Sequence, residues 1–446
     1  MDNLTHSVVG LGIGALIDRS LAPEPDTAAE RLRARLLLTV CCLASNFPDL
    51  DLVLTRLLEA PLGYLLHHRG HTHTLLVAVG EAALLLGLVW LLWPGARRLL
   101  RASAPARRGA VLAAGAGLLL HIGMDGLNVY GVHPFWPFDA GWYYGDLVFI
   151  VEPVFWIAFG VPLAAMVRRP WLRRAWLALL VAVPAGFTLA GFLPWGSLAG
   201  LLLLGAVLAW LQRRGAAPSA DATAPTTATA TTTQRPRRRR TALAAGLAAS
   251  LAFVAVQAAA MHAARGMIAA EIARLDGGER LLDVALSAYP ANPLCWSFVT
   301  VARNAGDDAA RSAGDDAARG AVHGAAGYHL RRGLLAIAPG VAPVGACPAP
   351  IAGAAPSGAT ALAWTADERL DLAVLRTLGA HDCHVNAWLR FARAPWLANG
   401  VATDVRWSPP GTPNFSTIDY AALAQAPCPH PVPGWGMPRA DLLAAP

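Results

Sequence analysis

Four of the 13 histidines stand within one seven-residue run, His67-His68-Arg69-Gly70-His71-Thr72-His73. Histidine is the commonest metal ligand because its neutral ring offers a nitrogen lone pair near pH 7. We expect this run to meet other polar residues of the same hydrophobic half of the chain in one metal site. These residues are His6, Asp49 with Asp51, and His121 with Asp125.

Residue spacing supports convergence at two of these places. Positions four apart share one face of a helix, so His121 and Asp125 can point at one ion, and His67 and His71 have the same spacing. Polar side chains inside a membrane span are costly and usually functional, which favours metal binding. The alternative for His121 with Asp125 is a hydrogen bond between helices.

The two aspartates, Asp49 and Asp51, follow Pro48. Because proline ends helical geometry, we predict both carboxylates on irregular backbone, where a water-accessible pocket can form. Solvated helix caps are the alternative interpretation. His6 is a lone histidine, for which a structural role is the alternative to ligation.

We predict different roles within the histidine run. His68 and His71 are the predicted ligands, whereas His67 and His73 are ligands, proton shuttles or phosphate contacts. The planar fork of Arg69 suits an anionic oxygen such as that of phosphate, with a lipid headgroup as the alternative partner. The full prediction assigns catalysis to Arg69 and His73, and metal binding to His6, Asp49, Asp51, His68, His71, His121 and Asp125.

The donor types predict the metal and its chemistry. Histidine and aspartate without thiolate favour zinc, with manganese or iron as alternatives. The candidates outnumber the ligands of one tetrahedral ion, so two metals are plausible, and such pairs activate water in phosphoester hydrolysis. No nucleophile elbow, P-loop or dinucleotide motif lies near the site, so metal-activated water is the predicted nucleophile.

The elements that must position these residues are membrane helices. The 446-residue chain is 55% hydrophobic, and eight apolar runs approach the ~20 residues that span a bilayer. We predict a mainly α fold, a polytopic helical membrane bundle of seven or eight spans followed by a soluble tail domain of α or α+β type. The runs cover residues 8–17, 36–54, 74–93, 109–127, 147–167, 175–193, 197–211 and 242–262.

Arginine positions predict the orientation of the bundle. They cluster in alternate loops, whereas the intervening loops hold only Arg56 and Arg69. The positive-inside rule then places the amino terminus and the tail outside the cytoplasm, and every candidate ligand at the outer face. The net charge of +7 reflects juxtamembrane arginines, so the bilayer is the predicted partner and nucleic acid is not.

Composition divides the chain into four predicted parts. They are the bundle at 1–211, a disordered cytoplasmic linker rich in Thr, Ala, Pro and Arg at 212–241, a last transmembrane helix at 242–262, and a periplasmic domain at 263–446. Four of the six cysteines lie in this last part. An even number in an oxidising compartment predicts two disulfides of unspecified connectivity, with free buried thiols as the alternative. These residues are Cys295, Cys347, Cys383 and Cys428.

Four motifs, in this order, resemble a known family. They are Met-Asp-Asn-Leu-Thr-His-Ser, Asn-Phe-Pro-Asp-Leu-Asp, His-His-Arg-Gly-His-Thr-His-Thr and His-Ile-Gly-Met-Asp. Over residues 1–165 the chain resembles the LexA-regulated, membrane-bound, predicted metal-dependent hydrolase family, also called YdjM-like. The resemblance implies an integral inner-membrane protein assigned to metal-dependent hydrolysis. Its polar motif positions match His6, Asp49, Asp51, His68, His71, His73, His121 and Asp125.

The predicted function is metal-dependent hydrolysis at the periplasmic membrane face, on a phosphoester of a lipid or envelope precursor. One alternative is a non-catalytic membrane protein whose metal holds the bundle together. Another is a metal or proton transporter, which needs ionisable residues through the membrane, where the sequence offers Glu81 and little else. The sequence does not specify the substrate, the number of metals or the oligomeric state.

Overall fold

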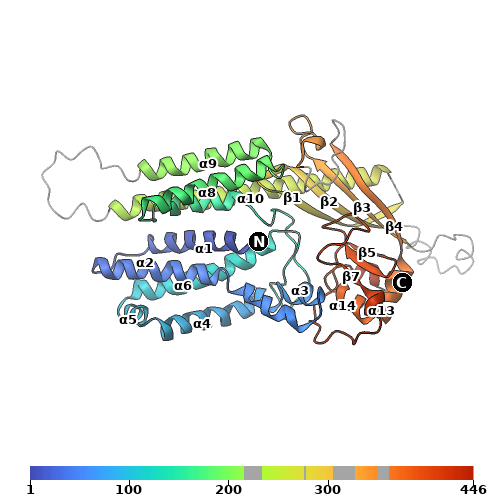
Figure 1. Cartoon of the computed structure of the whole chain (residues 1–446), viewed down its shortest axis with the longest axis horizontal. Coiled ribbons are helices and arrows are strands. Elements are labelled where there is room, and N and C mark those ends of the chain that lie inside the picture. The colour runs from blue at the N-terminus through green and yellow to red at the C-terminus, as the bar shows by residue number, and fades with distance from the viewer. Residues whose placement is uncertain (215–233, 276–277, 305–326, 349–360, 445–446) are drawn as a thin grey trace, which may run out of the picture.

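The structure is a computed structural model that describes residues 1–214, 234–275, 278–304, 327–348 and 361–444. Helices form one half of the molecule, and the strands and short helices of the carboxy-terminal region form the other half (Figure 1). Helix α10 (Gln234–Leu275) runs from the helical half into the strand-bearing half. The predicted mainly helical fold is therefore correct, and the tail is of the α+β type.

Three helices of the bundle pack closely because glycines face their neighbours. A Cβ on Gly117 would lie 2.6 Å from the Cβ of Ala44, and one on Gly14 would lie 2.8 Å from the carbonyl oxygen of Leu37. The backbones of α1, α2 and α6 therefore approach without intervening side chains. This packing brings the start of α1, the end of α2 and the end of α6 together. Their bounds are α1 (Asn3–Asp18), α2 (Thr27–Ala44) and α6 (Ala104–Gly126).

The remaining helices surround this group. Among the described residues, six helical segments are long and apolar enough to cross a membrane. Helix α1 and helix α7 (Pro153–Ala164) are apolar but shorter. Each predicted apolar run contains a helix, while the count of seven or eight spans stays a prediction. The other helices are α3 (Leu62–His67), α4 (Leu75–Leu92), α5 (Pro94–Ala102), α8 (Pro170–Leu189) and α9 (Trp195–Arg214).

The predicted run 36–54 contains a break. Helix α2 ends at Ala44, and a 3-10 helix, η1 (Pro48–Leu57), follows it. The prediction of irregular backbone after Pro48 is therefore wrong, because proline at the first helical position begins this new helix instead of preventing one. Within η1, Asp49 and Asp51 are buried, whereas Leu50 and Val53 are 57% and 71% exposed.

Helices occupy both ends of the predicted linker at 212–241. Helix α9 continues to Arg214 and α10 begins at Gln234, and residues 215–233 lie outside the described residues. The predicted boundary at residue 262 falls inside α10. Beyond it, Ile268 and Ile272 of this helix are buried against the first sheet of the tail, so burial of an apolar face carries the helix past the membrane span.

The described residues of the tail form two antiparallel sheets. The first has the order β1-β2-β3-β4 and the second the order β5-β6-β7. Short helices of the tail pack with the second sheet around a core that includes Trp388, Phe391 and Trp435. The strands are β1 (Glu279–Tyr289), β2 (Asn292–Asn304), β3 (Gly327–Ala336), β4 (Leu362–Asp371), β5 (Pro395–Ala398), β6 (Val401–Asp404) and β7 (Ile418–Asp419), and the helices are α13 (Leu372–His381), α14 (Cys383–Leu389), α15 (Tyr420–Leu423) and α16 (Ala440–Leu443).

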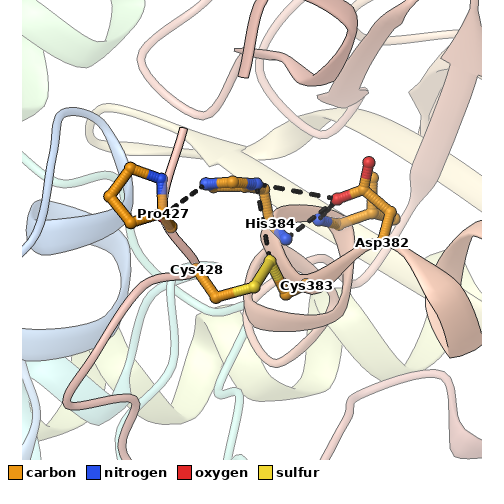
Figure 2. Close-up of a disulfide and its surroundings, with 6 residues drawn as sticks. Asp382, Cys383, His384, Pro427 and Cys428 are labelled. Atoms are coloured by element: carbon orange, nitrogen blue, oxygen red, sulfur yellow. Dashed lines mark hydrogen bonds and ion pairs between the residues drawn. A yellow bond between two sulfur atoms is a disulfide. The ribbon is translucent and has the colours of Figure 1, made fainter. Parts of the chain in front are cut away.

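The tail cysteines form two pairs at disulfide distance. Cys295 bonds to Cys347 and Cys383 bonds to Cys428, with S–S distances of 2.11 and 2.13 Å. Beside the second pair, the ring of His384 makes a 3.2 Å hydrogen bond to the carbonyl oxygen of Pro427 (Figure 2). The two predicted disulfides are therefore present, and the structure selects one of three connectivities.

The tail docks on the loop that follows α6 through a buried arginine. Both terminal nitrogens of Arg393 donate to the two oxygens of Asp146, at 2.8 and 2.9 Å, and its Nε lies 2.7 Å from Asp283. Asp146 belongs to the membrane half and Asp283 to strand β1. Because such a forked pair is directional, it fixes the tail against the end of the bundle.

Candidate metal centre

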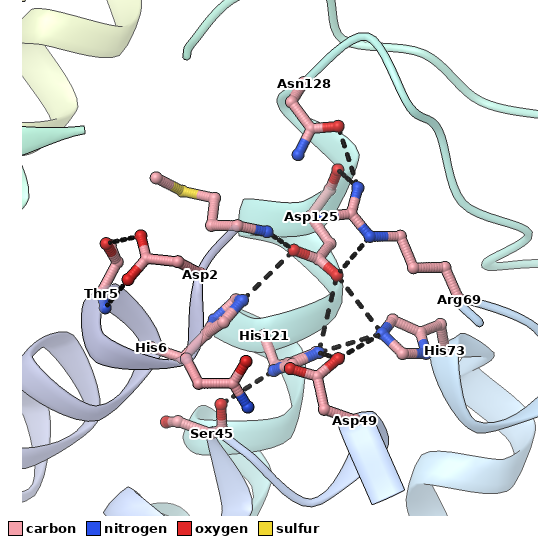
Figure 3. A network of polar contacts seen from close by, with 12 residues as sticks. Asp2, Thr5, His6, Ser45, Asp49, Arg69, His73, His121, Asp125 and Asn128 are labelled. Atoms are coloured by element: carbon pink, nitrogen blue, oxygen red, sulfur yellow. Dashed lines mark hydrogen bonds and ion pairs between the residues drawn. The ribbon is translucent and has the colours of Figure 1, made fainter. Parts of the chain in front are cut away.

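One end of the bundle gathers the candidate ligands (Figure 3). The start of α1 supplies His6, η1 supplies the two aspartates, the loop after α3 supplies His68 and His73, and the end of α6 supplies His121 and Asp125. All of these residues except His6 fall into two groups, each with donor atoms within 4.8 Å of one another, and every member is buried. The groups are Asp49, His73, His121 and Asp125, and Asp49, Asp51 and His68.

Two imidazoles in the first group face each other. The Nε2 atoms of His73 and His121 are 3.0 Å apart. Nδ1 of His121 lies 2.8 Å from the carbonyl oxygen of Ser45, and Nδ1 of His73 lies 3.2 Å from a carboxylate oxygen of Asp51. An oxygen acceptor at Nδ1 favours the proton on that nitrogen, which leaves the Nε2 lone pair of each ring pointing inward. Two such lone pairs repel each other at this distance unless a proton or another cation lies between them.

Carboxylates complete this first group. Asp49 Oδ1 lies 3.6 and 3.5 Å from the Nε2 atoms of His73 and His121, and Asp125 Oδ2 lies 3.3 and 3.6 Å from them. A proton can serve as the cation here: burial disfavours a charged ring, but the hydrogen bonds to Asp49 and Asp51 raise the pKa of His73. A metal ion at this position would replace that proton.

The second group ties down the histidine loop. Nδ1 of His68 lies 3.1 Å from Asp51, and the backbone N–H of Arg69 and the hydroxyl of Thr72 donate to the same carboxylate at 2.9 and 3.0 Å. Burial lowers the pKa of His68, which keeps the ring neutral and able to bind metal. Asp49 belongs to both groups, so its carboxylate would be available to an ion in either one.

Arg69 is paired inside the site. Its guanidinium is 1% exposed, its Nε lies 2.9 Å from Asp125 Oδ2, and its Nη1 donates to Asn128 at 2.9 Å. It also lies 4.7 Å above the ring of Tyr130. These contacts engage Nε and Nη1 and compensate the charge of Asp125, and the catalytic role of Arg69 stays a prediction.

His6 and His71 lie outside both groups. His6 contacts Asp125 at 3.2 Å and stacks on His121 at 4.0 Å, so it borders the first group, and the amino group of Met1 contacts the same carboxylate. His71 lies away from the groups: its ring centroid is 4.5 Å from that of Trp136 and 4.7 Å from that of Trp435 in the tail. The structure therefore supports His73 as a ligand where the sequence favoured His71.

The sequence also left out three residues that orient the groups. They are Ser45, which acts through its backbone carbonyl, Thr72 and Asn128. A backbone carbonyl carries no residue-type signal. Thr72, by contrast, stood within the histidine run, and a hydroxyl between candidate ligands is a usable signal.

Charge balance fits a divalent metal. Asp49, Asp51 and Asp125 are buried carboxylates, and Arg69 is the buried guanidinium paired with Asp125. With Arg69 charged and every imidazole neutral, these side chains carry two net negative charges, which is unfavourable in a buried site. Protonation of His73 removes one of these charges, and a divalent ion removes both. The donor set does not distinguish zinc from manganese or iron.

The fold and the site together define a class. The chain is a helical membrane protein with a buried Asp/His cluster that could bind a divalent metal. Residues 1–194 match the family model described as YdjM inner membrane protein. This match confirms the predicted resemblance, and it contains every member of both groups. Regulation by LexA and hydrolytic activity remain predictions.

A curated relative shares part of this region. Uncharacterized protein YfhP of Bacillus subtilis (strain 168) is 25% identical over 158 residues, which cover 35% of this chain and 44% of the relative. The alignment therefore spans less than half of that protein's length. No solved structure matches the chain.

Proposed function

We propose that this protein is a membrane-bound, metal-dependent hydrolase. The observation that carries the proposal is the pair of Nε2 lone pairs of His73 and His121, which face each other between Asp49 and Asp125. A divalent ion bound there would lower the pKa of a water molecule and stabilise the oxyanion of a phosphoester. Zinc is the favoured ion, with manganese or iron as alternatives.

The residues of the chain would prepare this chemistry in three ways. Ser45 and Asp51 hold the Nδ1 protons of His121 and His73, which directs both Nε2 atoms into the site. Asp49 bridges the two groups. Arg69 balances Asp125, so the cluster retains the charge that suits a divalent ion. Preorganised donors of this kind lower the cost of reorganisation during a reaction.

A phosphoester of a lipid or envelope precursor is the proposed substrate. Helix η1 supports this choice because its two faces differ. Asp49 and Asp51 are buried in the site, whereas Leu50 and Val53 are more than half exposed. A lipid-linked substrate can therefore place its apolar part along η1 and its polar part at the carboxylates.

We also propose the periplasmic face of the inner membrane as the location of the site. The tail, with its two disulfides, contacts the end of the bundle that carries the metal centre. Disulfides form and persist in oxidising compartments. The positions of the arginines support the same orientation.

Metal analysis and turnover of the purified full-length protein test the proposal together. We expect one or two equivalents of a divalent metal per chain, metal-dependent hydrolysis of a chromogenic phosphodiester, and loss of both in His121→Ala. Wild-type protein without stoichiometric metal after exposure to zinc, manganese and iron would falsify the proposal.

A structural metal is the second candidate, favoured by the burial of every donor and by the internal pairing of Arg69. A closed structural site leaves no coordination position for water. If this candidate is correct, metal removal lowers thermal stability, while the loaded protein hydrolyses no phosphodiester and no lipid-linked phosphoester.

A further inference from the structure

The carboxy-terminal segment 428–439, called the strap below, reaches the histidine loop from the tail. Its Trp435 is 1% exposed, and the indole N–H donates to the carbonyl oxygen of Leu66 at 2.8 Å. Leu66 lies in α3, directly before the histidine run. In Figure 1 the tail, including α14, lies beside α3. The strap is thus joined to the element from which the loop departs.

The ring of Trp435 also packs on the loop itself. It lies 4.7 Å from the ring of His71, and a Cβ on Gly70 would meet its Cζ2 at 3.2 Å. On its other side it stacks on His133 at 4.1 Å with an interplanar angle of 13°. The indole is therefore held between the histidine loop and the loop that follows α6.

Three bonds hold the strap in this position. Cys428 is bonded to Cys383 of α14, Arg390 donates to the carbonyl oxygen of Trp435 at 2.9 Å, and the N–H of Gly436 donates to Ala140 at 2.9 Å. The strap therefore cannot move without disturbing α14 or the loop after α6.

We infer that Trp435 is a positioning residue for the metal centre. It acts through Leu66, Gly70 and His71 on the loop that carries His68 and His73, and it does not touch either group. The inference rests on the proposed metal site. Residues that fix the orientation of ligands tune metal affinity, typically by ~10–100-fold. The strap lies beyond residues 1–194 that match the family model, so this chain supplies from its tail a support for a site built in its bundle.

Amide hydrogen exchange of the full-length protein in detergent tests the positioning without metal. In Trp435→Ala, we expect exchange of the amides of residues 66–73 to rise by about tenfold or more, since the loop loses its cover. Trp435→Phe keeps the ring and loses the bond to Leu66, so a smaller rise is expected. The matched control is Trp296→Phe, because Trp296 is also buried and its indole donates to the carbonyl oxygen of Pro293 at 2.9 Å in the first sheet of the tail.

Zinc titration of the same proteins tests the consequence for the centre. We expect affinity to fall by about tenfold in Trp435→Ala, less in Trp435→Phe, and by less than about twofold in Trp296→Phe. Thiol labelling verifies that both disulfides remain intact, and Trp435→Phe carries the test if Trp435→Ala does not fold.

The outcomes separate the two proposals. Unchanged loop exchange in folded Trp435→Ala or Trp435→Phe overturns the inference, as does faster exchange with wild-type zinc affinity. Equal effects of Trp296→Phe and Trp435→Phe also overturn it, because they indicate general loosening of the tail. Wild-type protein that binds no zinc defeats the proposed function, and the exchange data then still show whether the strap holds the loop.

Discussion

Two regions of the molecule combine buried histidine with carboxylates, and they differ in what the ring nitrogens face. In the tail sheet, Nδ1 of His329 lies 2.7 Å from Glu279 and Nε2 contacts Asp367, while Arg331 pairs with both carboxylates. Each nitrogen of this ring has its own acceptor. At the bundle end, the Nε2 atoms of His73 and His121 instead face each other.

This difference shows that residue composition does not define a metal centre. In the His329 network, each of the two carboxylates contacts both the imidazole ring and the guanidinium of Arg331. In the bundle, Arg69 pairs with Asp125, and the other two carboxylates have histidines as partners. Converging lone pairs with uncompensated negative charge are the feature that indicates a cation site.

The largest expected effect on stability comes from removing the buried guanidinium of Arg69. Arg69→Ala leaves Asp125 buried without its guanidinium, which should lower the free energy of unfolding by about 3–5 kcal/mol in metal-free protein. Bound zinc should reduce that loss, because the ion compensates the same carboxylate. Unfolding in mixed micelles with and without zinc measures this, with exposed Arg56→Ala as the control. A loss that zinc does not change would contradict the charge balance proposed for the site.

Neutralising Asp49, the carboxylate shared by the two groups, should weaken metal binding strongly while destabilising the fold less than Arg69→Ala does. Asp49→Asn keeps the shape of the side chain and removes one charged donor from both groups. We expect zinc affinity to fall at least ~100-fold, measured by competition with a chelating dye. Glu59→Gln, an exposed carboxylate on the same side of the bundle, should leave affinity unchanged. Retained zinc binding in Asp49→Asn would exclude Asp49 as a ligand.

The buried ring of His133, which lies outside the metal centre, predicts that the stability of the protein depends on pH. Burial lowers the pKa of His133 to about 3, below the ordinary value of ~6.5. Its contribution to stability is therefore complete above pH 6.5 and is lost as pH falls toward 3, because the unfolded chain binds a proton that the folded chain does not. The thermal midpoint of wild type should fall more steeply than that of His133→Gln below pH 6.5. Parallel curves for the two proteins would argue against this assignment.

The smallest effect should come from the tail network. The side chain of Asp367 is 61% exposed, and such pairs contribute about 0–1 kcal/mol. Asp367→Asn should therefore change the thermal midpoint only slightly and leave zinc stoichiometry at the wild-type value. Loss of zinc in this variant would remove the distinction between the two regions.

Local sequence features predicted the helices and the set of candidate ligands. Each apolar run contains a helix, because a long stretch of consecutive apolar residues favours a helix that is buried in lipid or protein. The spacing of His121 and Asp125 on one helix face also carried over to the structure, since helical geometry fixes it. The sequence predicted that the helix ends near Pro48, but it did not predict the 3-10 helix that begins there.

The sequence by itself determined the membrane class, the family resemblance and the inventory of histidines and aspartates, because these depend on residue types and short spacings. Only the tertiary structure decided that His73 enters the centre and His71 does not. These residues belong to one short turn, and long-range contacts orient it: Asp51 and His121 on one side and Trp435 on the other. The cysteine pairing and the partner of Arg69 were decided in the same way, since each depends on which distant segments the fold brings into contact.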